Sequence, residues 1–454
     1  MSILSKEHAD MKKNILNNLL LAAAACLSFI ACKDEPYRYE MTSGKPEILY
    51  IRPAGVAKDT LLTEAYMGSS LCIVGNNLRS TYKVFFNDQE AILNSSYITD
   101  NTMLLDVPNT IPGEVSNKIY FITKGDGATE YDFKVRVPGP TITSMDCEWL
   151  PEGSSAKLLG DYFIDDPNVP ITVTFEGGVK AEITNITKNI LTFVIPEGAK
   201  EGPISVETIY GSASSTFYYK DSRGMVFDFD TDPRLRCHGW HNSLFIGTDE
   251  TSLSGNYLQL GAPDVTMTAT GGWDDSHFSF EYWPGDWTTP ISYNDSPILS
   301  DFADFSDFEN LLFKFELNIP SSNGWAAGAM QIIPAGLDKV SGSDSGEDVY
   351  GNIVAGANNK FFNTTAEGGL NVRRGIYQPW TSADDGIYHT DGQWITVSIP
   401  VKNFIYGFDG TESSAAKLTS AEFNTLTIFV VGGPEGLECN PVLKIDNIRY
   451  VPAK

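Results

Sequence analysis

Two stretches decide the fold of this chain: GSSLCIVGNNL at Gly68–Leu78 and GSSAKLLGDYF at Gly153–Phe163. Each begins with a Gly-Ser-Ser turn, continues as a strand-like run and ends at a Gly-Asn or Gly-Asp corner, where we expect a positive φ. A V-x-F strand follows each copy, starting at Val84 and at Val173. The copies begin about 85 residues apart, which is the size of a small β-sandwich.

Both copies resemble the IPT/TIG immunoglobulin-like domain. We expect one such sandwich over residues 45–138, after a linker at 33–44, and a second over residues 139–220. A Pro-Gly-Pro segment joins them, and proline restricts that hinge. The copies contain a single tryptophan, Trp149, and no dense aromatic or ionisable cluster. They are therefore interpreted as a semi-rigid stalk.

The character of the chain changes at residue 221. Residues 221–454 hold all the tryptophans except Trp149, and no segment keeps a helical period over three turns. Strand-like runs recur at 311–317, 329–333, 394–400, 425–431 and 443–451. We therefore expect an all-β chain, in which a larger jelly-roll-type β-sandwich follows the two tandem immunoglobulin-like sandwiches.

The N-terminus predicts export. Met11, the expected start, precedes two lysines, and the apolar run Leu19–Ala31 is too short to span a bilayer but typical of a signal peptide over residues 1–31. The run ends FIAC, which resembles the bacterial lipobox whose cysteine, here Cys32, is lipidated. The acidic tag after it resembles that of Bacteroidota-type lipoproteins on the outer face of the outer membrane. Cleavage without a lipid is the alternative.

The overall charge excludes one class of partner. A formal charge of −26 lacks the basic patch that nucleic acid requires, so we expect no nucleic-acid partner. Neutral ligands remain open. No cofactor is indicated, although the acidic segment Ser341–Asp348 suggests a structural Ca²⁺ whose ligand spacing matches no known loop.

The cysteines beyond the signal are interpreted as free thiols. Cys72, Cys147, Cys237 and Cys439 lie in or beside apolar strand patterns, and no C-x-x-C motif occurs. Export permits disulfides, and a Cys237–Cys439 bond would lie within one domain. That alternative stays open.

Six tryptophans lie in loop-like contexts, four directly beside glycine or proline and two around a Pro-Gly turn. Trp283 and Trp287 surround a Pro-Gly turn in FSFEYWPGDWTTP, Phe278–Pro290. The others are Trp240, Trp273, Trp325 and Trp380. Loops tend to be exposed, and this many bare indoles on a surface favour a binding role. Trp394, within a continuous strand, is expected in the core.

Carbohydrate stacking is the use that fits exposed indoles. An indole face covers the C–H surface of a pyranose, while nearby Asp, Asn and Gln bond its hydroxyls. Burying roughly 60 Å² is worth about 1.5 kcal/mol per ring. Three rings, less the ordering costs, predict millimolar to micromolar affinity.

The whole mature chain is similar to cell-surface glycan-binding lipoproteins encoded with outer-membrane polysaccharide uptake systems. The lipobox, the tandem IPT-like domains and the closing strand IDNIRY carry this resemblance, especially to the group whose C-terminal domain binds xyloglucan or related β-glucans. It implies a non-catalytic protein that faces the cell exterior and hands polysaccharide to an importer complex and companion glycan-binding lipoproteins. The family's adjacent Tyr-Trp platform maps to Tyr282 and Trp283, and less firmly Trp240 joins it.

Two other functions stay open. Glu281 and Asp286 flank the aromatic pair, either as hydroxyl partners of a glycan or as the two carboxylates of a glycoside hydrolase. Strand alternation places Glu281 opposite to Tyr282, and neither G-x-S-x-G nor H-E-x-x-H occurs, which weakens the enzyme hypothesis. A structural or adhesive lipoprotein is the other alternative.

Overall fold

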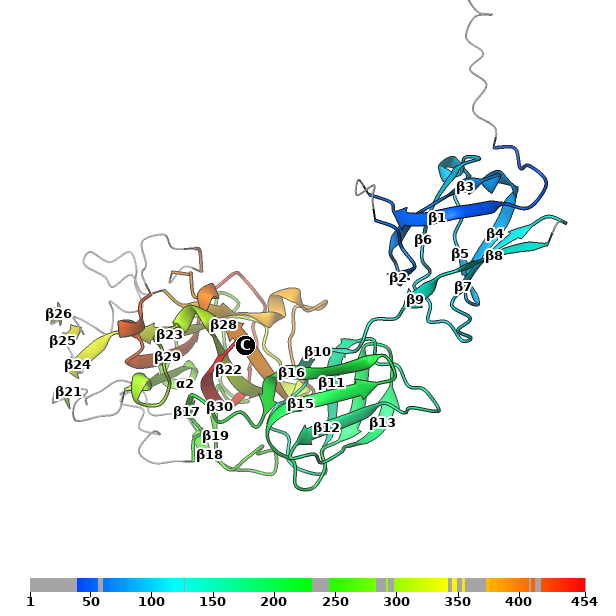
Figure 1. The fold of residues 1–454 in the computed structure, drawn as a ribbon. Helices are drawn as coiled ribbons and strands as arrows, with labels where there is room; N and C mark the ends of the chain where they lie inside the picture. The colour runs from blue at the N-terminus through cyan, green and yellow to red at the C-terminus, as the bar shows by residue number, and fades with distance from the viewer. Residues whose placement is uncertain are drawn as a thin grey trace, which may run out of the picture. The chain divides into compact units, whose positions relative to one another are not determined.

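Where the structure describes the chain, it forms β-sandwiches with only short helical turns (Figure 1). The structure, a computed structural model, describes residues 39–55, 60–125, 127–230, 245–282, 291–292, 298–341, 345–348, 353–355, 373–407, 410–412 and 418–453. It divides between Pro138 and Gly139 into two compact units. In the part of the chain described, no helix is both long and apolar enough to cross a membrane.

The first unit is a small sandwich with its own core. Its strand orders are β1-β3-β6 and β5-β4-β7-β8, and β2 pairs with β9 in parallel. Leu71, Ile73, Phe86 and Phe121 are among its buried residues. The strands are β1 Glu47–Pro53, β2 Glu64–Tyr66, β3 Ser70–Asn76, β4 Thr81–Phe86, β5 Gln89–Ala91, β6 Thr102–Asp106, β7 Lys118–Thr123, β8 Ala128–Asp132 and β9 Lys134–Arg136, with 3₁₀ turns η1 Leu78–Ser80 and η2 Ser95–Tyr97.

The second unit begins with another immunoglobulin-like sandwich. Its strand orders are β10-β11-β14-β13 and β12-β15-β16. Leu158, Phe175, Phe193 and Tyr219 lie in its core. The strands are β10 Thr141–Met145, β11 Ser155–Asp161, β12 Thr172–Glu176, β13 Glu182–Ile186, β14 Ile190–Val194, β15 Lys200–Thr208 and β16 Gly211–Tyr219.

The repeated glycine has a different role from the one expected. The positive φ lies one residue after the Gly-Asn or Gly-Asp step, at Asn77 (φ 54°) and Tyr162 (φ 57°). Gly75 and Gly160 are required because a Cβ there would meet a backbone oxygen of the first strand, at 2.0 and 1.9 Å. The corner prediction was therefore wrong by one residue, and close strand approach explains the glycine.

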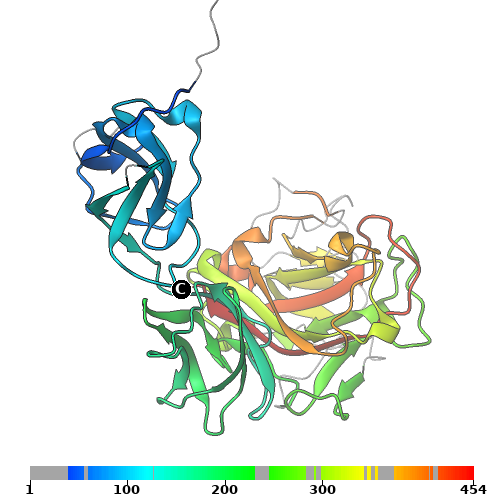
Figure 2. The ribbon, with the colours of Figure 1, turned by 90° about the vertical axis from the view of Figure 1, so that its right-hand side faces the viewer.

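The rest of the second unit is the larger C-terminal sandwich. One sheet has the order β18-β19-β30-β22-β28 with β17 also on β30, and the other is β20-β29-β23-β27. Figure 2 shows the final strand, in red, within the larger sheet. A third small sheet has the order β21-β24-β25-β26. The strands are β17 Met225–Phe227, β18 Phe245–Gly247, β19 Tyr257–Leu260, β20 Ser279–Tyr282, β21 Ile291–Ser292, β22 Leu311–Asn318, β23 Ala329–Ala335, β24 Leu337–Ser341, β25 Ser345–Asp348, β26 Ile353–Ala355, β27 Gly375–Tyr377, β28 Trp394–Pro400, β29 Thr425–Val431 and β30 Leu443–Pro452.

Helical turns are confined to connections in this sandwich. The one-turn helix α2, Asp275–Phe278, precedes β20 and is capped by Asp274, which accepts from the backbone N–H of His277. The 3₁₀ turns are η4 Leu299–Asp301, η5 Phe308–Asn310, η6 Ser321–Asn323, η7 Pro379–Ser382, η8 Val401–Asn403 and η9 Ser420–Glu422.

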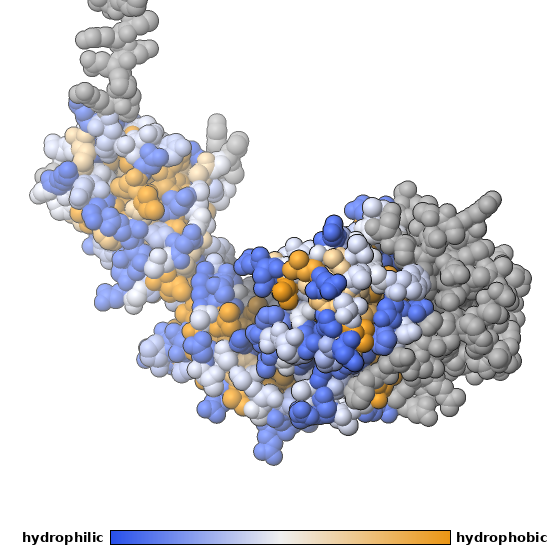
Figure 3. Space-filling model, turned by 180° about the vertical axis from the view of Figure 1, so that it is seen from behind, coloured by the Kyte–Doolittle hydropathy of each residue, from blue (hydrophilic) through white to orange (hydrophobic). Residues whose placement is uncertain are grey.

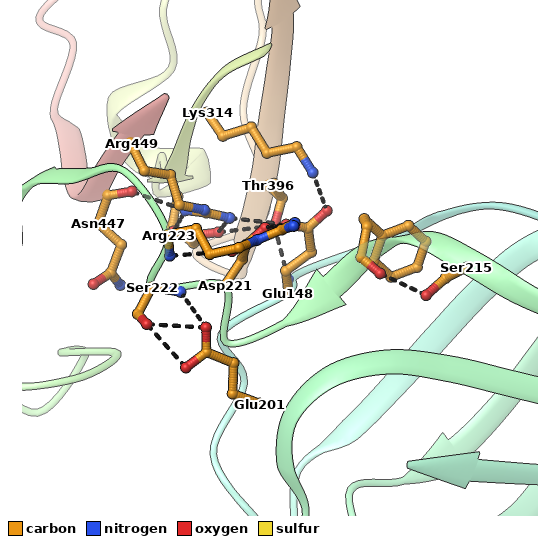
Figure 4. Close-up of polar contacts among 12 residues, drawn as sticks. Glu148, Glu201, Ser215, Asp221, Ser222, Arg223, Lys314, Thr396, Asn447 and Arg449 are labelled. Carbon is orange, nitrogen blue, oxygen red and sulfur yellow. Dashed lines mark hydrogen bonds and ion pairs between the residues drawn. The ribbon is translucent and has the colours of Figure 1, made fainter. Parts of the chain in front are cut away.

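A buried ion network fixes the second immunoglobulin-like domain to the C-terminal sandwich (Figure 4). Glu148 contacts Lys314 Nζ at 2.6 Å and Arg449 Nη2 at 2.8 Å. Arg449 also pairs with Glu316, which accepts from the hydroxyl of Thr396. Two acids and two bases balance there, so none is buried without an opposite charge.

Apolar contacts and the connecting segment complete this joint. Trp394 is buried as expected, but against Cys147 and Tyr257 at the joint rather than in the main core. Its indole N–H donates to the carbonyl of Thr251 at 2.7 Å. Along the connection, Arg223 pairs with Asp221 through two bonds of 2.8 Å. The two domains therefore form one body within the second unit.

The described cysteines form no disulfide, and the acidic segment expected to hold Ca²⁺ is partly strand. Cys72, Cys147 and Cys439 are free thiols, as predicted, and Cys237 lies outside the described residues. The segment Ser341–Asp348 is not a single loop, because Ser341 ends β24 and its last four residues form β25. No group of three or more His, Cys, Asp or Glu that could hold a metal occurs among the described residues.

Candidate functional site

One face of the sheet β20-β29-β23-β27 carries polar groups in a row. The register pairs Phe280 with Ile428 and Tyr282 with Leu426, and Phe280 and Tyr282 pack edge-on against Phe227 of β17. Alternation therefore turns Ser279, Glu281 and their β29 partners to the opposite face. We call this second face the polar face. Its polar groups are those of Ser279, Glu281, Thr427 and Gln331, with Arg374 bonded to Gln331, and apolar residues including Phe429 and Ile333 lie on the same side. The side chains named here are at most 2% exposed.

Glu281 is the acidic group of the polar face. Its side chain is 1% exposed, and its Oε1 accepts from the hydroxyl of Ser279 at 3.0 Å. Burial raises the pKa of Glu281 to about 7, and the charge of Asp275 adds to that rise, whereas the Ser279 hydrogen bond opposes it. The carboxyl therefore titrates near neutral pH, and it lies opposite to Tyr282, as strand alternation predicted.

Tyr282 does not present its ring to solvent. The family resemblance predicts an exposed tyrosine here, but the side chain is 2% exposed and lies 5.2 Å, ring to ring, from Phe227. Burial raises the pKa of Tyr282 to about 12. The expectation of exposure was wrong because this position falls on the core side of β20.

Trp273 is the exposed indole of the described residues. Its side chain is 50% exposed, and its ring meets Phe429 of the polar face edge-on at 4.8 Å. The segment before it is held tightly, because a Cβ on Gly271 would lie 2.3 Å from the carbonyl oxygen of Gly432. The N–H of Gly432 donates to the carbonyl of Gly271 at 2.7 Å. Close backbone approach thus places Trp273 at the margin of the polar face.

Trp325 and Trp380 are core residues, which corrects their prediction as exposed platforms. They are 0% and 5% exposed, and the indole N–H of each donates to the carbonyl of Gly328, at 3.1 and 3.0 Å. Trp325 also donates to Ala327 at 2.8 Å. The neighbouring glycine and proline do mark turns, but both indoles point into the core, where their N–H groups donate to backbone carbonyls.

The remaining predicted residues cannot be placed. Trp240, Trp283, Asp286 and Trp287 lie outside the described residues. Trp283 directly follows Tyr282, the last residue of β20.

Two residues of the polar face escaped the sequence analysis. Gln331 is buried in the otherwise apolar strand β23 and donates to the carbonyl of Val431 at 3.1 Å. Arg374 is fully buried and donates to the Gln331 side-chain oxygen at 2.8 Å. The signal was a lone glutamine inside an apolar strand, since a buried amide requires partners.

Comparison with known proteins identifies this domain. The family described as "Surface glycan-binding protein B xyloglucan binding domain" matches residues 219–452, more than half of the chain. The chain belongs to this surface glycan-binding protein family. The matched segment contains both sheets of the C-terminal sandwich, the polar face and Trp273.

The similarity to this family extends beyond the matched domain. The crystal structure of the surface glycan-binding protein PbSGBP-B from Prevotella bryantii is 43% identical, covers 91% of this chain and 100% of that chain, and superposes with a TM-score of 0.76. An IPT/TIG domain-containing protein from Bacteroides ovatus is 30% identical over 190 residues. That alignment covers 38% of this chain and 39% of the Bacteroides protein. The protein is thus a surface glycan-binding protein with IPT/TIG domains.

Proposed function

We propose that this protein is a non-catalytic, lipid-anchored receptor that captures xyloglucan or a related β-glucan outside the cell. The match of residues 219–452 to a xyloglucan-binding domain carries the proposal. Trp273 stacks on one sugar ring, and Trp240, Trp283 and Trp287 supply further indoles. Asp286 bonds sugar hydroxyls. Glu281, which is 1% exposed, is buried too deeply to contact a sugar and does not take the hydroxyl-binding role expected from the sequence.

The physical support is the exposure of Trp273. About half of the Trp273 side chain is in contact with water at the margin of the polar face. A pyranose face can therefore cover the exposed part of the indole. Covering it is worth about 1–2 kcal/mol.

The proposed lipid anchor determines where the receptor lies in the cell. Lipidation of Cys32 holds the chain on the outer face of the outer membrane, and the polysaccharide passes from there to an importer complex and companion glycan-binding lipoproteins. Replacing Cys32 with serine tests the anchor. Labelled palmitate should be incorporated by the natural chain alone, and protease added to intact cells should digest it. Incorporation into the Cys32→Ser variant would contradict the assignment.

Glycan capture is tested by affinity electrophoresis of the full chain in gels that contain xyloglucan, mixed-linkage glucan, mannan, xylan or starch. We expect retardation by xyloglucan, and Trp273→Ala should weaken it by about tenfold while changing the free energy of unfolding by less than about 1 kcal/mol. Tyr82→Ala, which truncates a 47% exposed ring in the first unit, is the matched control and should bind normally. Retardation by none of the glycans would refute the proposal.

The hydrolase alternative has its own readout. Reducing sugar released from xyloglucan, and abolished by Glu281→Gln, would favour catalysis. Retention in the gel without release supports a receptor, because binding requires no second carboxylate placed across a cleft.

A further inference from the structure

The two immunoglobulin-like copies differ at one strand. In the second copy, β14 pairs with β11 on one side and with β13 on the other. In the first copy, β6 pairs with β3, and within the described residues its other side makes an isolated bridge, Ile98 to Met103, but pairs with no strand. The segment that corresponds to β13 contains instead the 3₁₀ turn η2, Ser95–Tyr97.

The equivalence of the two strands is fixed by matching hydrogen bonds. Gly75 donates to Asn101 and Gly160 to Asn189, both at 3.0 Å. At the other ends, Val107 donates to Ser69 and Ile195 to Ser154, both at 2.9 Å. These bonds align residues 101–107 with residues 189–195. Leu104 therefore corresponds to Thr192, and Asp106 to Val194.

The same bonds show which backbone groups of β6 face outward. Because Asn101 and Val107 bond toward β3, alternation turns Leu104 and Asp106 away from it. Their counterparts Thr192 and Val194 pair with Asn185 and Glu182 of β13. The first copy therefore keeps an open sheet edge where the second copy has a covered one.

Apolar side chains and a pocket lie along this open edge. Ile92 is 91% exposed, Tyr97 56% and Leu104 36%, and all three line a pocket of about 690 Å³. That volume lies in the range of ligand-binding clefts. Orange, apolar residues of this unit also reach the surface in Figure 3.

We propose that the outer edge of β6 accepts an extended segment of a protein partner as an added strand. A polypeptide matches this edge because its own N–H and C=O groups repeat with the spacing of Leu104 and Asp106, whereas sugar hydroxyls do not. Apolar side chains of the partner cover Ile92, Tyr97 and Leu104. A lysine or arginine of the partner faces Asp106, which lines the pocket, whereas Glu90 is already paired with Lys83.

The charges on this edge favour a basic peptide over a second copy of the chain. Two copies would bring together two edges that each carry Asp106, and each chain has a formal charge of −26. Like charges set directly opposite each other across paired strands are destabilising. The site is also independent of the glycan site proposed above, since it lies wholly within the first unit.

The test uses the full chain in mild detergent and a fluorescently labelled peptide with capped ends. In this peptide every second residue is threonine, and the residues between the threonines are two valines and one lysine. We expect saturable binding by fluorescence anisotropy and slower hydrogen exchange at Thr102–Asp106. Ile92→Lys and Leu104→Lys should each weaken binding by at least about tenfold. Leu159→Lys is the matched control, because this 38% exposed leucine lies on β11, both edges of which are paired.

Three results would overturn the proposal. The first is no binding of the peptide up to about 1 mM. The second is equal binding of a peptide methylated on its backbone nitrogens, since such a peptide cannot donate to the edge. The third is displacement by a xylogluco-oligosaccharide, which would make the pocket a sugar site. Trp273→Ala should leave peptide binding unchanged, so failure of glycan capture and failure of this proposal can be told apart.

Discussion

The ion pairs of the first unit and those at the joint of the second unit differ in burial. The ion pairs described in the first unit join strands at its surface, and each partner is more than a third exposed: Lys83–Glu90, Lys118–Glu130 and Arg136–Glu64. In the second unit the four charged side chains of the joint are at most 4% exposed. Exposed pairs add little to stability, whereas a buried pair makes each member dependent on the other. The ion pairs on the surface of the first unit therefore contribute little to its stability, whereas the buried ion network joins the two domains of the second unit.

The largest expected effect comes from breaking the joint. Glu148→Ala should cost about 3–5 kcal/mol, because Lys314 and Arg449 would lose a buried counter-charge. Denaturant unfolding monitored by tryptophan fluorescence measures this selectively, since every tryptophan of the chain lies after Gly139.

The matched control is Glu64→Ala in the first unit. It removes a glutamate from an exposed pair with Arg136 and should destabilise the chain far less than Glu148→Ala. Because the first unit contains no tryptophan, its stability is measured by hydrogen exchange in β2 and β9. Equal losses in the two variants would show that burial of the joint does not set its energetic importance.

The second effect is a pH dependence of opposite sign at two buried carboxyls of the second unit, Glu281 and Asp446, and at the exposed Glu64 of the first unit. Burial raises the pKa of Glu281 to about 7 and that of Asp446 to about 8, so the folded second unit favours their neutral forms. This stabilisation is complete below their ordinary pKa values and is lost as the pH rises through about 7 and 8. In the first unit, hydrogen bonding to Arg136 lowers the pKa of Glu64, whose contribution is instead lost as the pH falls.

Glu281→Gln isolates one carboxyl of this pair. The amide cannot ionise, so the variant should be more stable than the natural chain at pH 8 by about 1–3 kcal/mol and nearly equal to it at about pH 4. Thermal unfolding followed by tryptophan fluorescence across this range measures the difference. Parallel pH profiles of the two proteins would contradict the assignment of this titration to Glu281.

Strands with uninterrupted β-forming residues could be predicted from the sequence. The runs 394–400 and 425–431 were predicted with the bounds that the structure gives, because branched and aromatic residues alternate there between polar turns. The repeat likewise predicted both small sandwiches, since strand spacing and turn residues are local signals.

The direction in which a loop folds could not be predicted. Glycine beside Trp325 and beside Trp273 indicates a turn in both cases, yet one indole is 0% and the other 50% exposed. The difference depends on the carbonyl of Gly328, which accepts from Trp325 and belongs to the turn leading into β23. For Glu148, the partners Lys314 and Arg449 are 166 and 301 residues away, so no local pattern announces a joint.

The smallest effect concerns salt. At about 1 M salt the screening length falls to about 3 Å, which weakens exposed pairs but leaves the dry joint nearly unchanged. Arg136 also lies 5.8 Å from the ring centre of Tyr66, and this contact is screened less than a pair of full charges. Arg136→Ala should therefore speed hydrogen exchange in β2 and β9 by less than about fivefold at low salt, and by a smaller but measurable factor at 1 M salt. A salt-independent change would assign the residue's contribution to the ring rather than to Glu64, and the surface charges of the first unit would then serve solubility alone.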